Sequence, residues 1–102
     1  MSNVYILVDN PQSSLNFLPA EKFGELKVLY PHPINPTQLR TIYADLEGKL
    51  MNITDDDYLL PTGPPALIAM AGYIWMDTLG SMKVLTWDRA TQQYYAIEEN
   101  CS

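Results

Sequence analysis

The run Val4-Tyr5-Ile6-Leu7-Val8 constrains the fold more than any other stretch of the sequence. Its β-branched and aromatic residues favour a strand, and Asp9-Asn10-Pro11 ends it. The run does not alternate between apolar and polar residues, so neither face of the strand suits contact with water. We therefore predict a strand at 4–8 that is buried on both faces of its sheet.

Four further apolar runs predict strands at 26–30, 58–60, 82–87 and 93–97. A first helix is expected to begin at Pro36, with Asn35 as its N-cap and Gln38 as the capping-box partner. Its apolar residues recur at helical spacing and form one stripe, made of Leu39, Ile42, Tyr43, Leu46 and Leu50.

A second helix is expected over residues 66–79, ended by Gly80. This segment is apolar nearly all round, which is typical of a helix covered on more than one side. We therefore expect it to be the most buried element of the protein. A single helical turn is expected at 20–23.

The order of these elements predicts the fold class. Helices between strands indicate right-handed crossovers and a parallel sheet, whereas the short turn at 88–92 requires an antiparallel hairpin. We predict one small α/β domain of the Rossmann-like or flavodoxin-like type, with two main helices. Its mostly parallel sheet has the order 2-1-3-4-5, with the last strand antiparallel at the edge. A length of 102 residues fits one such domain.

Composition argues against several classes of function. The net charge is −6, and the six Lys and Arg residues are scattered, so we expect neither a nucleic-acid partner nor binding to an anionic membrane. One cysteine allows no internal disulfide. The first apolar run is too short for a signal peptide or a membrane span, and the expected location is the cytoplasm.

Polar residues after the predicted parallel strands form a first candidate site, because ligands of open α/β sheets bind at the carboxyl ends of the strands. The set consists of Asp9, Asn10, His32, Thr62, Gly63, Asp88 and Arg89. These side chains suit a small polar ligand or a nucleotide, or a minor enzyme activity. The alternative is that turns recruit these residue types for backbone reasons.

No motif in the sequence indicates a particular enzymatic reaction. The phosphate-binding patterns GxxxxGK[ST] and GxGxxG are missing, and Pro64 and Pro65 lack the N–H groups that hold a phosphate at a helix start. His32 accompanies no nucleophile-elbow pattern. The run 55–57 of three aspartates lacks the spacing of a calcium loop and indicates a solvated turn. We expect no catalytic residues, cofactor or metal, and we favour a protein that is not an enzyme.

Trp87, Tyr94 and Tyr95 form a second candidate site, for another protein. Tyr94 and Tyr95 are adjacent on a predicted strand and must point to opposite sides of the sheet, so we expect one in the core and one exposed. An exposed tyrosine can anchor a partner protein, whereas the alternative is that all three rings fill the core. The edge strand 93–97 or the helix 66–79 can also pair with a second copy of the chain.

The segment from Asp57-Tyr58-Leu59-Leu60-Pro61-Thr62-Gly63-Pro64-Pro65 to Lys83-Val84-Leu85-Thr86-Trp87-Asp88-Arg89 resembles small uncharacterised proteins of tailed bacteriophages. The resemblance covers about residues 57–97. It implies an accessory protein that binds and redirects a host protein in the infected bacterium, and it supplies no catalytic residues. With the acidity and the aromatic C-terminal third, it leads to the hypothesis of a non-enzymatic protein-binding module.

Overall fold

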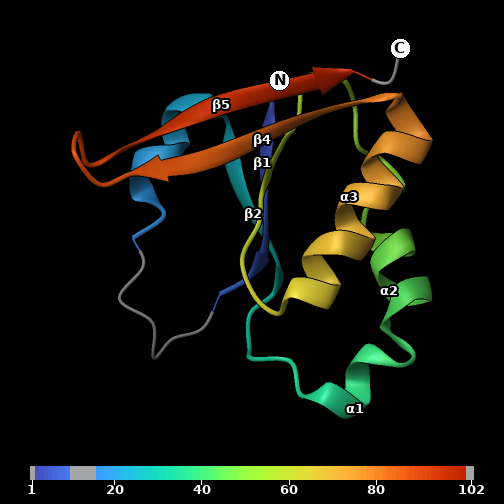
Figure 1. The fold of residues 1–102 in the computed structure, drawn as a ribbon. Coiled ribbons are helices and arrows are strands. Elements are labelled where there is room, and N and C mark those ends of the chain that lie inside the picture. Colours follow the sequence, from blue (N-terminus) through green and yellow to red (C-terminus); the bar gives the residue numbers. More distant parts are fainter. Residues whose placement is uncertain (1, 10–15, 101–102) are drawn as a thin grey trace.

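The computed structural model describes residues 2–9 and 16–100 (Figure 1). Its strands are β1 (Asn3–Val8), β2 (Glu25–Tyr30), β3 (Tyr58–Leu60), β4 (Ser81–Asp88) and β5 (Gln93–Asn100). Its helices are the 3₁₀ helix η1 (Leu18–Phe23) and the α-helices α1 (Pro36–Leu39), α2 (Ile42–Lys49) and α3 (Pro65–Leu79).

The five strands form one sheet in the order β2-β1-β3-β4-β5. Strands β1 to β4 are parallel, and β5 pairs antiparallel with β4. The predicted α/β class, strand order and antiparallel edge strand are therefore confirmed. Strand β2 lies on one side of β1 in the sheet, whereas β3 and β4 lie on the other side. Right-handed crossovers then put η1 on one face and α1, α2 and α3 on the opposite face (Figure 1).

The core is divided between the two faces of the sheet, and β1 contributes to both. On the helical face, Leu7 packs in one cluster with residues of α2 and α3, including Trp75, whose ring lies edge-on to that of Tyr5. On the other face, Val4 and Ile6 pack with residues of η1 and β4. All five residues from 4 to 8 are buried, so the prediction of a strand buried on both faces is confirmed.

The first predicted helix is interrupted. Its capping box is present, with the Asn35 side chain accepting from the Gln38 backbone N–H and the Gln38 side chain accepting from that of Asn35. Thr41 then leaves helical geometry, with φ −122° and ψ 3°, and its N–H bonds to the oxygen of Gln38 three residues back. The expectation of one continuous helix was wrong for this local reason.

The apolar stripe of the interrupted helix is only partly buried. Ile42, Leu46 and Leu50 are buried in the core, and Leu39 packs against it. Tyr43 was expected in the same apolar stripe, but its side chain is 37% exposed and is not part of the buried surface.

Helix α3 begins at Pro65 and ends at Gly80, which has the left-handed φ of 73° expected of a C-terminal stop. The helix buries one face, with Leu67, Ala71, Ile74 and Trp75 in the core. Its outer face is open, and Tyr73 is 61% exposed. The expectation that this helix is the most buried element was wrong, because no further layer of the described chain lies outside it; β1 is more deeply buried.

Candidate functional site

The carboxyl ends of β1 and β3 are joined by the hydroxyl group of Thr62. This oxygen accepts a hydrogen bond from the backbone N–H of Val8 at 2.9 Å and donates one to the backbone oxygen of Val8 at 2.6 Å. The N–H of Asp9 bonds to the oxygen of Tyr30 at the end of β2. The Thr62 side chain therefore holds the ends of β1 and β3 together, and the Asp9 backbone holds the ends of β1 and β2 together.

Gly63 lets the chain turn from β3 toward α3 across the side chain of Val8. Its φ of 102° lies in the left-handed region, and a Cβ atom at this position would be 2.6 Å from Cγ2 of Val8. Any larger residue would push against a buried valine. The glycine is required by this close approach, which is a backbone role of the kind that turns commonly demand.

Three further residues of the strand-end set, His32, Asp88 and Arg89, form no contact with Thr62 or Gly63 among the hydrogen bonds and ion pairs of the described residues. His32 is exposed after β2. Asp88 is the last residue of β4 and accepts a hydrogen bond from the N–H of Ala90, and Arg89 follows it in the β4–β5 turn. Figure 1 shows this turn well away from the carboxyl ends of β1 and β2. Asn10 lies outside the described residues. The ligand-binding role of this set stays a prediction.

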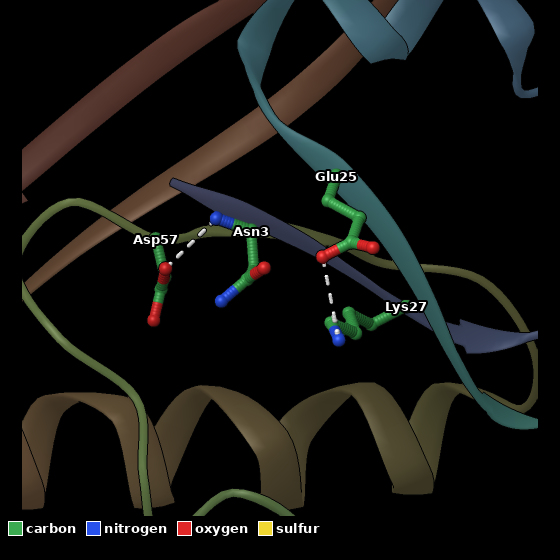
Figure 2. Close-up of polar contacts among 4 residues, drawn as sticks. All are labelled: Asn3, Glu25, Lys27 and Asp57. Atoms are coloured by element: carbon green, nitrogen blue, oxygen red, sulfur yellow. Dashed lines mark hydrogen bonds and ion pairs between the residues drawn. The ribbon is translucent and has the colours of Figure 1, made fainter. Parts of the chain in front are cut away.

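Asp57 has a structural role inside the protein, whereas the run 55–57 predicts a solvated turn. Asp55 and Asp56 are exposed, but Asp57 is buried. One carboxylate oxygen accepts a hydrogen bond from the backbone N–H of Asn3 at 2.9 Å (Figure 2). The other accepts one from the backbone N–H of Thr54 at 2.8 Å. Asp57 therefore ties the loop before β3 to the start of β1. The only sequence signal was its position directly before a strand.

Figure 2 also shows the start of β2, where Lys27 and Glu25 form an ion pair at 3.4 Å. Both side chains are largely exposed, so the pair adds little stability. Across residues 2–9 and 16–100, no three His, Cys, Asp or Glu side chains form a group that could hold a metal ion.

In the β4–β5 hairpin, Tyr94 is buried and Tyr95 is 49% exposed. The expectation of one tyrosine in the core and one at the surface is confirmed. The ring of Trp87 lies 4.9 Å from that of Tyr94, so Trp87 accompanies the buried tyrosine and Tyr95 lies opposite Thr86. Burial raises the pKa of Tyr94, as expected for a phenol in the core.

Tyr95 belongs to a surface that we call the hairpin face, made of the half-buried Val84 and Thr86 and the exposed Tyr95 and Ile97. Ile97 is 41% exposed. Val84 is in register with Leu59, which packs in the core under α3, so the hairpin face looks to the helical side of the sheet. Figure 1 shows that the hairpin extends beyond α3, and Tyr95 and Ile97 on this face are exposed.

The outer edge of β5 is the second open feature of the hairpin. β5 is the last strand in the sheet order, and within the described residues no strand pairs with its outer edge. Seven of its eight residues are not buried, and it contains no proline or lysine, two residues that commonly protect edges. Its free N–H and C=O groups can pair with another strand.

A comparison with protein-family models places the chain among phage proteins. The model of the phage Pam3 gp32-like proteins matches residues 2–101. The chain belongs to the phage Pam3 gp32-like protein family. The resemblance inferred from residues 57–97 is thus confirmed, and it extends over nearly the whole chain. Searches of curated proteins and of solved structures gave no match.

The most open part of the described structure is the β4–β5 hairpin. The hairpin combines free backbone groups on one edge with tyrosine and aliphatic side chains on the adjoining face. Within the described chain, no helix is long and apolar enough to span a membrane.

Proposed function

We propose that this phage protein is a non-enzymatic protein-binding module that binds and modulates a protein of the bacterial host. The observation that supports the proposal is the open β4–β5 hairpin. An edge strand binds an extended segment of a partner through backbone hydrogen bonds, and side chains beside the edge select the partner. The edge of β5 and the hairpin face offer both contacts on one strand.

Two residues of the strand-end set bond within the fold, which indirectly favours a protein-binding role over binding of a small ligand. The Thr62 hydroxyl is engaged twice with the Val8 backbone, and Asp88 stabilises its own turn. Tyr95 and Ile97 are exposed side by side on the hairpin, and a partner that covers them would gain by burying their apolar surface.

The proposed occupant of the edge is a strand of a host protein in the cytoplasm of the infected cell. A second copy of the chain is the less favourable occupant because each copy carries a net charge of −6. Each β5 also carries Glu98 and Glu99, so pairing two copies would add like charges to one sheet, and like charges repel. Self-association through 93–97 or through helix 66–79 is an alternative that the experiment separates.

The test uses affinity capture from host cells, followed by titration of the purified captured protein. The partner should bind wild type and Met51→Ser equally, since Met51 is an exposed apolar residue outside the hairpin. Tyr95→Ser should weaken binding at least about tenfold, as loss of an interface tyrosine commonly does. Nuclear magnetic resonance should show the largest shifts at residues 93–100.

Two results would contradict the proposal. One is equal binding by Tyr95→Ser and wild type. The other is a stable dimer of the free protein in analytical ultracentrifugation that Tyr95→Ser dissociates, which would assign the edge to a second copy.

A further inference from the structure

Two exposed tyrosines lie together on the outer surface of the helices, away from the hairpin. Tyr43 of α2 and Tyr73 of α3 are 37% and 61% exposed, and their ring centroids are 6.4 Å apart. The rings are tilted by 43° and are not stacked face to face. We call these residues the tyrosine pair. Ring surface therefore faces water on both helices.

Two carboxylates flank the tyrosine pair. Glu47 follows Tyr43 by four residues on α2, and Asp77 follows Tyr73 by four residues on α3, so each acid lies one turn from its tyrosine. Partial desolvation raises the pKa of Tyr43, and the charges of Glu47 and Asp77 raise it further. Both acids thus act on the same ring from different helices.

The basic residue at the end of α2 is directed elsewhere. Lys49 forms an ion pair with Asp45 at 3.9 Å and lies over the ring of Tyr30 at 5.2 Å. Helix α3 contributes no basic residue at all. The surroundings of the tyrosine pair are therefore aromatic and acidic, which is complementary to a cation.

We infer that the tyrosine pair, together with Glu47 and Asp77, binds an arginine side chain on a basic segment of a partner protein. The face of an aromatic ring attracts a cation. Arginine fits better than lysine because its planar guanidinium stacks on a ring and donates two parallel hydrogen bonds to a carboxylate. The net charge of −6 attracts such a segment from a distance. The inference does not depend on the proposed role of the hairpin.

The test is a titration with a capped peptide of alternating arginine and glycine, followed by nuclear magnetic resonance. Backbone signals of α2 and α3 near Tyr43 and Tyr73 should shift. The arginine side-chain protons of the peptide should move upfield, because they lie over the rings. Removing both rings in Tyr43→Leu/Tyr73→Leu should weaken binding about tenfold. The same peptide with lysine should bind more weakly.

A matched control is Leu18→Ala, which removes an exposed apolar side chain from η1 on the other face of the sheet and should bind the peptide as wild type does. Circular dichroism establishes that each variant is folded, and the single variant Tyr73→Leu serves if the double variant is not. Equal affinity of wild type and the ring-deleted variant would overturn the inference. So would binding without upfield shifts, since diffuse negative charge alone would then account for it.

Discussion

β1 and β5 belong to the same sheet but differ sharply in burial. β1 buries five of its six residues, whereas β5 buries one of its eight. β1 has a strand on each edge and packed side chains on both faces. Among the strands of residues 2–9 and 16–100, β5 pairs with β4 alone, and the hairpin reaches beyond α3 (Figure 1). The comparison separates a centre that holds the fold together from a hairpin that remains available for contacts.

The largest expected contrast comes from the same substitution in the two regions. Ile6→Ala should lower the free energy of unfolding by about 2–5 kcal/mol, because it empties a buried position in β1. Ile97→Ala should cost less than about 1 kcal/mol, because that side chain is already in water. Urea denaturation of both variants measures the difference. Equal losses would show that the hairpin is packed as tightly as the centre.

A second contrast concerns the aspartates before β3. Asp57→Ala should lower stability by about 2–4 kcal/mol, because it leaves the buried N–H groups of Asn3 and Thr54 without an acceptor. Asp56→Ala, one residue away and exposed, should change stability by less than about 0.5 kcal/mol. Similar values in thermal or urea unfolding would mean that Asp57 does not tie the loop to β1.

The smallest effect is expected where β2 meets α2. Burial, followed by the hydrogen bond that Tyr30 donates to Asp45 at 2.7 Å, raises the pKa of Tyr30 above its ordinary value of 10.0. The resulting stability is fully present below pH 10 and is lost at higher pH, because the unfolded state releases this proton first.

Tyr30→Phe tests this linkage. The variant should be less stable than wild type by about 0.5–1 kcal/mol at neutral pH, and the difference should shrink as pH rises above 10. Urea unfolding at several pH values measures it. A difference that does not change with pH would show that the phenol proton is not held in the folded state.

Most of the sheet could be predicted from local sequence. Apolar runs mark the strands, and the helices between them imply parallel crossovers. The break at Thr41 could not be predicted, because it depends on two dihedral angles inside a continuous periodic pattern. The burial of Asp57 could not be predicted either, since its partner Asn3 lies 54 residues away in sequence.

The candidate site shows the same limit. Strand alternation requires Tyr94 and Tyr95 to face opposite sides, but only packing of Tyr94 in the cluster that contains Ala20 of η1 decides which one is buried. The strand-end residues follow the rule for parallel sheets, yet Figure 1 shows the β4–β5 turn well away from the carboxyl ends of β1 and β2. Local sequence patterns therefore could not predict which of the two tyrosines is buried or where the hairpin lies relative to the other strand ends.

Amide hydrogen exchange of the free protein tests most directly the claim that the centre is closed and the hairpin open. The amides of residues 4–8 should exchange slowly. Along residues 93–100, alternate amides should exchange fast, because in an antiparallel pair every second N–H points away from the neighbouring strand. Slow exchange of all amides in 93–100 would contradict the account, because it would mean that the edge is already occupied.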